Sequence, residues 1–428
     1  MDNNEKNNPI NLIFPYGNKP EKVGLEISEN EVTFTFPINY YHNNGEKKIS
    51  CYSLNEKKEY EDYRKTILIL LRLLSKYRDE NEVKNYNKNE NNFPIEAYLW
   101  IIRDYIENGI YKDSETYYCI NGKGKINWKK TIKQGKTFLD NENLVYKDLI
   151  KRKVNYNIEN QITEIHTFCV QKAISILGFI YGLPPQKFKN IKISDEIKLQ
   201  WLQILKKELL VSYNDHKISL LKNMIDMLQS QDANKFNSHE FSLVTNDYDY
   251  VFERLVDDKF GNVCSSDYNP QGEIKLEDEG ISSAGQMRPD TICIDDSGIY
   301  IIDSKYYTYG YVGDRKGGTL PDISSINKQI TYAQYIQNPL NNLNPNNKEI
   351  YNIFLLPKNV DFNDKNGIVK SELRDDLSYI GYANIKNRYQ DKYDYIYMFL
   401  INFTKLVENE LSEECLEEIK RITKIIKK

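Results

Sequence analysis

Two carboxylates and one ammonium group lie near one another in the second half of the chain, at a spacing that suits phosphodiester chemistry. Asp290 precedes a short apolar segment, and Asp303 and Lys305 end the next one, after a DDSG turn. Alternate residues of a strand point to the same face, so Asp303 and Lys305 should share a face. A hairpin at the turn would bring Asp290 beside them. The sequence therefore predicts that the three groups converge at one rim of a small sheet.

Hydrolysis of a phosphodiester needs such groups, because the attacking water must lose a proton and the transition state gathers negative charge. Mg²⁺ prefers oxygen ligands and often takes only one or two carboxylates from a protein, with water and phosphate at its other positions. We expect Asp290 and Asp303 to bind Mg²⁺, with the main-chain carbonyl of Ser304 as a further ligand. Lys305 would orient the attacking water or stabilise the developing charge.

Two expected helices carry residues that could support this centre. The helix from about residue 323 to residue 336 presents Lys328, Gln329 and Tyr332 within one turn, so all three can face one cleft. We predict Gln329 as a catalytic-site residue and Lys328 and Tyr332 as DNA contacts. The helix before the hairpin carries Glu253, which could add a carboxylate to the metal or its surroundings. The alternatives are a surface ion pair for Glu253 and a fortuitous charged hairpin for the motif itself.

The length and the patterning of the chain predict two domains. A chain of 428 residues is long for one ordinary core, and the polar segment SQDANKFNSHE separates two differently patterned parts. We therefore place a boundary near residue 235 and expect domains at 1–235 and 236–428. The first should combine short strands within residues 12–41 with helices at about 60–78, 94–107, 158–180 and 194–229. The second should be α/β, with strands at about 288–295, 298–307, 350–357 and 379–385, helices at about 249–257 and 323–336, a polar loop at 265–286 and a helix-rich C-terminus.

Basic residues are concentrated in one stretch of the N-terminal half, although the formal net charge of the chain is −4. Residues 121–160 contain ten Lys and Arg against four Asp and Glu, which could track a DNA backbone. A solvated surface is the alternative for this stretch. In the NWKKTI segment we expect Trp128 to anchor a core while Lys129 and Lys130 face DNA phosphates, and the alternative is that the whole segment is structural. The predicted DNA contacts in this stretch are Lys125, Trp128, Lys129, Lys130 and Lys133.

Several segments resemble the LlaJI restriction endonuclease family and, more distantly, McrC nuclease subunits. They are RPD-x12-DSKYY, PDISSINKQITYAQYI, FPIEAYLWIIRDYIENG, GKINWKKTI and EIHTFC, so the resemblance covers most of the chain in patches. It implies a PD-(D/E)XK restriction-endonuclease-like fold (α/β, or α+β) in the C-terminal domain, behind a mixed, helix-rich DNA-recognition domain. In that family Asp290, Asp303 and Lys305 would correspond to the catalytic motif, and Gln329 to the helix that follows it.

The resemblance also implies a function, namely site-specific, Mg²⁺-dependent double-strand cleavage of foreign DNA by a bacterial restriction-modification system. One such centre cuts one strand, so a homodimer or a second nuclease subunit is expected. A cognate DNA methyltransferase and a partner resembling the McrB NTPase are further companions. The chain has no Walker A loop of its own, because QGKT at 134–137 has Lys130 where the first Gly belongs. The alternatives are an McrC-like subunit that needs such an NTPase or modified DNA, and a non-catalytic DNA-binding subunit.

Composition predicts a cytoplasmic protein without membrane contact. The sequence contains no apolar run of about eighteen residues, and its six cysteines are scattered without a C-x-x-C pair. We therefore expect reduced thiols, with neither a disulfide framework nor structural zinc. His166 and Cys169 have a helical spacing that could bind a metal, but we interpret them as one face of a packed helix.

Overall fold

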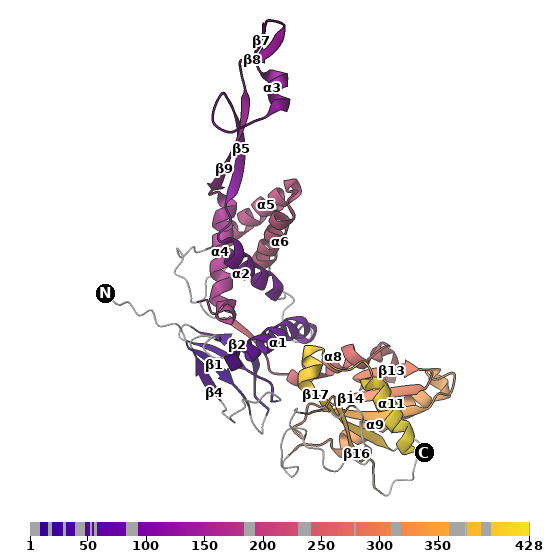
Figure 1. Cartoon of the computed structure of the whole chain (residues 1–428). Coiled ribbons are helices and arrows are strands. Elements are labelled where there is room, and N and C mark those ends of the chain that lie inside the picture. Colours follow the sequence, from indigo (N-terminus) through magenta and orange to yellow (C-terminus); the bar gives the residue numbers. More distant parts are fainter. Residues whose placement is uncertain are drawn as a thin grey trace. The chain divides into compact units, whose positions relative to one another are not determined.

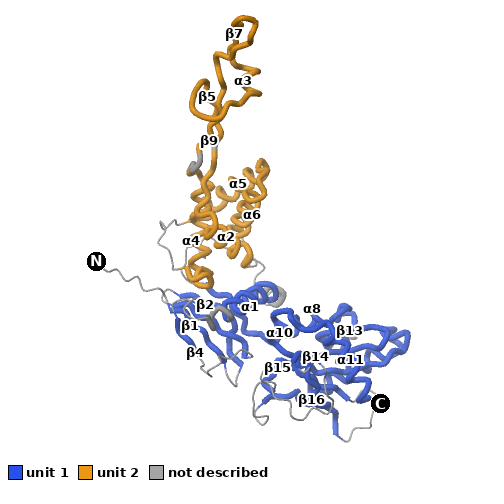
Figure 2. The backbone as a smooth tube through the Cα atoms, in the orientation of Figure 1, with its two compact units in different colours: residues 1–87, 240–428 blue, residues 88–239 orange. Residues whose placement is uncertain are grey.

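The protein forms two compact units, which are coloured separately in Figure 2. Unit 1 contains residues 1–87 and 240–428, and unit 2 contains residues 88–239. The computed structural model describes residues 9–15, 19–28, 31–38, 48–51, 54, 58–82, 93–183, 193–229, 241–277, 280–309, 318–358, 373, 375–386 and 395–427. The predicted boundary near residue 235 lies outside them, close to where the chain returns to unit 1. The first 87 residues group with the C-terminal half, which the prediction of domains at 1–235 and 236–428 did not anticipate.

The N-terminal part of unit 1 is a five-stranded sheet with helix α1 (Lys58–Glu82) beside it. Its strand order is β10-β2-β3-β1-β4. Leu12, Leu25 and Phe34 are fully buried in it, which accounts for the alternating apolar pattern of the segment. The strands are β1 (Ile10–Ile13), β2 (Val23–Ile27), β3 (Val32–Thr35), β4 (Lys48–Cys51) and β10 (Phe241–Thr245).

The C-terminal part of unit 1 contains a second five-stranded sheet of order β13-β14-β15-β17-β16. Its three inner strands are parallel to one another, and the two outer strands are antiparallel to their neighbours. The strands are β13 (Thr291–Asp295), β14 (Gly298–Ser304), β15 (Ile350–Lys358), β16 (Leu377–Ala383) and β17 (Ile396–Asn402). The expected α/β class is therefore confirmed.

Strand β17 was missed, since the sequence predicted a helix-rich C-terminus there. Every residue of IYMFLIN is buried, because an inner strand of such a sheet is covered on both faces and shows no alternation. Helices α10 (Phe403–Glu408) and α11 (Cys415–Lys427) follow it. The predicted polar loop at 265–286 also differs, for it contains a short 3-10 helix (Ser265–Tyr268) and a hairpin of β11 (Gln271–Leu276) and β12 (Gly280–Gln286).

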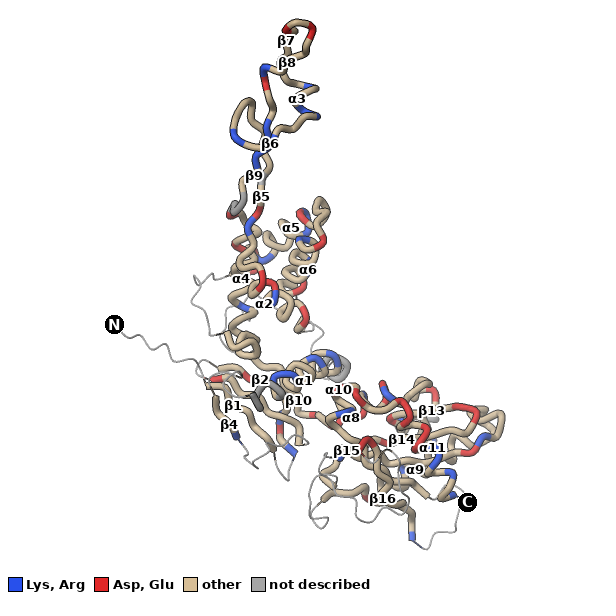
Figure 3. The backbone as a smooth tube through the Cα atoms, viewed as in Figure 1, with Lys and Arg blue, Asp and Glu red and all other residues tan. Residues whose placement is uncertain are grey.

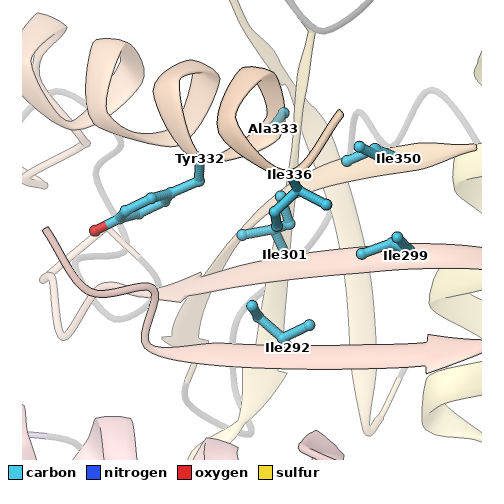
Figure 4. Packing of buried hydrophobic residues seen from close by; sticks show 7 residues of the cluster. All are labelled: Ile292, Ile299, Ile301, Tyr332, Ala333, Ile336 and Ile350. Carbon is cyan, nitrogen blue, oxygen red and sulfur yellow. The ribbon is translucent and has the colours of Figure 1, made fainter. Parts of the chain in front are cut away.

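Helices cover both faces of the second sheet. Helix α9 (Ile323–Gln337) begins at Asp322, whose carboxylate accepts a hydrogen bond from the Ser325 main-chain N–H at 2.9 Å. Figure 4 shows this helix packed on strands β13, β14 and β15 through a buried cluster of Ile292, Ile299, Ile301, Tyr332, Ala333, Ile336 and Ile350. On the opposite face, Lys420 of α11 lies 5.8 Å from the centre of the Tyr300 ring. Helix α8 (Tyr248–Phe260) contacts β13 and β14.

Unit 2 combines packed helices with a β-ribbon that carries a small outer segment (Figure 1). The predicted helical segments are confirmed as α2 (Ile95–Asn108), α4 (Gln161–Leu177), α5 (Asp195–Val211) and α6 (Asp215–Gln229). The strands had not been predicted. They are β5 (Asp113–Ile120), β6 (Lys125–Ile126) and β9 (Ile150–Ile158), with α3 (Trp128–Gln134) and the hairpin β7 (Thr137–Asp140) and β8 (Asn143–Tyr146) further out.

Local sequence determines where helix α4 begins and which of its faces is buried. Asn160 and Thr163 form a reciprocal capping box at its start. His166 and Cys169 are buried on its inner face, where the Nδ1 atom of His166 accepts a hydrogen bond from the Tyr111 N–H at 2.9 Å. Their interpretation as a packed helix face is confirmed. Among the helices built from described residues, none combines the length and apolarity needed to cross a bilayer.

Candidate active site

Asp290, Asp303 and Lys305 meet at one end of strand β14. The carboxylate of Asp290 accepts a hydrogen bond from the Ser304 main-chain N–H at 2.8 Å. The ammonium group of Lys305 lies 2.6 Å from Oδ2 of Asp303. The main-chain N–H of Lys305 donates to Leu355 of β15 at 2.9 Å, which holds the strand end against its parallel neighbour. The structure thus brings together the three residues that strand periodicity and the DDSG turn had placed on one rim.

Helix α9 supports this end of the strand from within the core. Gln329 is fully buried and donates from Nε2 to the carbonyl of Ile301 at 2.7 Å. Its Oε1 atom is also buried and has no hydrogen-bond partner among the described residues. Tyr332 is fully buried as well, and its hydroxyl donates to the carbonyl of Arg288 at 2.6 Å. Tyr332 had been predicted to contact DNA, but it lies in the core, because the side of α9 that carries it faces the sheet.

Glu253 on α8 lies within electrostatic reach of the same groups. Burial raises the pKa of Glu253 to about 7, and although Lys305 opposes this, the Asp303 carboxylate adds to it. Burial also raises the pKa of Asp290 well above its usual range, with Asp303 and Glu253 adding to the effect. The ammonium group of Lys328 is a further cation that acts on Glu253. Burial and mutual repulsion thus disfavour the ionised forms of Glu253 and Asp290, and a cation bound between the carboxylates would favour them.

The donor set fits a hard divalent cation such as Mg²⁺. Within the described part of the chain, no group of three or more His, Cys, Asp or Glu side chains is arranged to hold a metal ion. Two carboxylates are nevertheless sufficient for Mg²⁺, which keeps water and substrate oxygens in its other positions. A divalent charge would also relieve the repulsion between Asp290 and Asp303. Asp290 and Asp303 are thus the candidate metal ligands. The side chain of Glu253 is not arranged with them as a third ligand.

Arg288 was missed as a site residue, although the RPD segment contains it. Its carbonyl accepts from Tyr332, and its Nε donates to Ser265 Oγ at 3.2 Å. These contacts hold the chain two residues before Asp290. The signal in the sequence was the arginine of RPD, whose side chain is exposed and whose charge acts on Asp257 of α8.

The predicted DNA contacts of the basic stretch all lie in unit 2, on β6 and α3 (Figure 3). Lys125, Lys129 and Lys133 are exposed, and Lys130 is half-buried with its ammonium group 3.4 Å from the centre of the Tyr118 ring. Trp128 is 55% exposed and touches Tyr146 edge-on. The expectation that Trp128 anchors a core is therefore wrong, and its ring is available to a ligand.

Comparison with known proteins adds a family relationship to this geometry. The model of the LlaJI restriction endonuclease family matches residues 22–375 of the chain. The chain is also similar to a Bacillus subtilis (strain 168) protein named Type II restriction enzyme BsuMI component YdjA, with 24% identity over 267 residues. That similarity covers 58% of this chain and 55% of the relative, so the chain spans about half the length of that protein.

Proposed function

The chain belongs to the LlaJI restriction endonuclease family, and we propose that it hydrolyses phosphodiester bonds of double-stranded DNA at Asp290, Asp303 and Lys305 with the help of Mg²⁺. The observation that carries the proposal is the convergence of two carboxylates and one ammonium group at the end of β14. This is the donor set of a PD-(D/E)XK nuclease. The biological role would be site-specific restriction of foreign DNA in a bacterial host.

Asp290 and Asp303 would bind the ion, with the carbonyl of Ser304 as a further oxygen ligand. Bound Mg²⁺ would supply Lewis-acid chemistry at the phosphate and promote deprotonation of the attacking water. The hydrogen bond from the Ser304 N–H fixes one oxygen of Asp290, so that its other oxygen can face the ion. Rigid carboxylates of this kind reduce the reorganisation that the reaction requires.

Lys305 would stabilise charge that develops on the phosphate. Burial lowers its pKa, but Asp303 and Asp290 outweigh this and raise the pKa overall, which keeps the side chain protonated. A protonated lysine can contact a non-bridging phosphate oxygen or orient the attacking water. Gln329 would act indirectly, because its amide holds the carbonyl of Ile301 two residues before Asp303.

The basic segment of unit 2 would contribute phosphate contacts outside the cleavage centre. Lys125, Lys129, Lys130 and Lys133 carry the charge, and Trp128 offers an exposed aromatic face. Contacts to phosphate position a protein on DNA without reading its sequence. Lys328, close to Glu253, would add a cation beside the scissile bond.

The test is cleavage of unmethylated plasmid DNA by the purified protein in Mg²⁺, with binding measured in Ca²⁺. Asp303→Asn should abolish cutting. Asp296→Asn is the matched control, because Asp296 is exposed in the turn at the other end of the same hairpin, and it should cut normally. Full activity of Asp303→Asn would overturn the assignment. Release of nicked circles instead of linear DNA would show that a second copy or a second nuclease subunit must cut the other strand.

A second candidate is a nuclease subunit that works only inside a larger restriction enzyme. The Bacillus subtilis relative is named as a component of a type II restriction enzyme, which favours this candidate. The partner would be a McrB-like NTPase, and a methyltransferase would protect the host DNA. Binding in Ca²⁺ without cleavage in Mg²⁺ by the wild type alone, followed by cleavage when the partner and a nucleoside triphosphate are added, would identify this case.

A further inference from the structure

The N-terminal sheet of unit 1 has no part in the proposed reaction, yet the chain connects it directly to the cleavage centre. Strand β10 pairs with β2 at one edge of that sheet. Only two residues separate β10 from helix α8, and the second of them, Asp247, caps the helix by accepting from the Tyr250 N–H. The chain that leaves the edge of the N-terminal sheet thus enters, two residues later, the helix that carries Glu253.

Both ends of α8 are also held by the N-terminal part of the chain. At the first turn, the ammonium group of Lys19 lies 2.7 Å from the carboxylate of Asp249. At the last turn, Asp258 accepts hydrogen bonds from Lys76 at 2.6 Å and from the hydroxyl of Tyr77 on α1. Exposed ion pairs each contribute at most about 1 kcal/mol, so these contacts add little to overall stability, but they link both ends of α8 to the N-terminal part of the chain.

A third connection reaches the residue next to the catalytic lysine. Tyr306 is buried, and its ring packs against Tyr248, Phe252 and Phe403 at centroid distances of 5.2, 5.8 and 6.1 Å. Its hydroxyl oxygen accepts a hydrogen bond from the Ile38 main-chain N–H at 3.2 Å, at the end of the N-terminal sheet. Phe252 precedes Glu253 on α8, and Tyr306 follows Lys305. The contact between these two rings therefore links the residues next to both Glu253 and Lys305.

Tyr306 is well placed to fix the direction of Lys305. The main chain leaves the sheet at this point, since the Tyr307 N–H turns back to the Lys305 carbonyl at 2.8 Å. On one side, the Lys305 N–H is held by Leu355 of β15 at 2.9 Å. On the other side, the Tyr306 ring and hydroxyl are the anchor. This anchor attaches the chain after β14 to both α8 and the N-terminal sheet, and the ammonium group of Lys19 lies nearby, 5.3 Å from the centre of the Tyr306 ring and 5.6 Å from that of Tyr307.

We propose that the N-terminal sheet with α1 is a brace for the cleavage centre, and that Tyr306 is the positioning residue through which it orients Lys305. The assignment of Lys305 as a catalytic residue rests on the proposed function, whereas the brace itself does not. A sheet at the N-terminus of a nuclease would ordinarily be assigned to DNA recognition, as residues 1–235 were from the sequence. Here its contacts are with the supports of the site.

The experiment compares the full-length wild type with Tyr306→Phe, which removes the acceptor for the Ile38 N–H and keeps the ring. The matched control is Tyr379→Phe, because the hydroxyl of Tyr379 is equally buried in unit 1 but has no hydrogen-bond partner among the described residues. Two readouts are taken. Hydrogen exchange by mass spectrometry follows the main-chain amides of Ser304 and Lys305, and plasmid cleavage gives kcat and KM.

In Tyr306→Phe we expect amide exchange at Ser304 and Lys305 to rise about tenfold or more, with no such change in the control. We also expect kcat to fall by about tenfold or more, because small displacements of a catalytic group are costly, while KM for DNA stays within about twofold. Exchange equal to that of the control would overturn the brace. Raised exchange with unchanged kcat would overturn the positioning role. If the wild type alone does not cleave, autonomous cleavage by this chain fails, and the exchange result still decides on the brace.

Discussion

Replacement of Glu253 by Gln should make the metal-free protein more stable at alkaline pH, although Glu253 belongs to the site. Burial and the nearby Asp303 carboxylate raise the pKa of Glu253 from 4.5 to about 7. Between these two pH values the folded protein retains a proton that the unfolded chain has released, so the free energy of unfolding falls as pH rises. A rise of this size corresponds to about 3 kcal/mol, fully lost above about pH 7.

Glutamine carries no charge, so Glu253→Gln escapes this loss. In EDTA, urea unfolding should show the variant about 3 kcal/mol more stable than the wild type at pH 8, and less than about 1 kcal/mol more stable at pH 5. Added Mg²⁺ should narrow the gap at pH 8, because a divalent cation at Asp290 and Asp303 removes repulsion that Glu253 experiences. Glu273→Gln, on the exposed strand β11, should differ little from the wild type at either pH. Equal stabilities of Glu253→Gln and wild type at pH 8, or a gap independent of pH, would refute the reasoning.

Three further results are expected. Gln329→Leu leaves the Ile301 carbonyl without its donor and should lower the free energy of unfolding by about 1–3 kcal/mol; an unchanged urea midpoint would contradict this. Burial lowers the pKa of His166 to about 4 from 6.5, so unfolding of unit 2 should become easier by up to about 3 kcal/mol as pH falls from 6.5 to 4. His166→Gln should flatten that dependence in melts at several pH values, and an equally steep wild-type and variant profile would be inconsistent with a buried neutral imidazole. Replacing Lys129 and Lys133 together by Met should weaken DNA binding and reduce the salt slope by about 0.9 per lysine, measured by fluorescence anisotropy; an unchanged slope would exclude both lysines as phosphate contacts.

The centre of the site could be predicted because its geometry is local. Strand periodicity places Asp303 and Lys305 on one face, and the DDSG turn brings Asp290 beside them. One hairpin therefore contains all three residues, and no contact between distant segments had to be predicted. The grouping of the first 87 residues with the C-terminal half depends on the pairing of β10 with β2. Nothing in either strand identifies its distant partner, so sequence patterns could not reveal that grouping.

Other differences come from burial, which periodicity predicts only in part. Tyr332 and Lys328 are close on α9, but the helix turns Tyr332 into the core and leaves Lys328 half-buried near Glu253. Strand β17 is apolar at every position except its last, Asn402, a pattern that buried helices and buried strands share. The described residues of β5 and β9 are largely exposed. The alternation of VNYNI at 154–158 is short and lies in a charged segment, and it was not interpreted as a strand.

The pairing of β10 with β2 also has a consequence for synthesis of the protein. Leu25 and Leu243 are register partners, 218 residues apart in the chain. At about 5–20 residues per second, a ribosome needs roughly 10–40 s to reach β10 after β2. During that time β2, paired with β3 on one side only, would be an edge strand of the sheet, and such an edge is prone to pairing with other chains. The nascent protein therefore depends on the late synthesis of β10 to cover this edge. Helix α8, which follows β10 directly, then brings Glu253 toward Asp290 and Asp303.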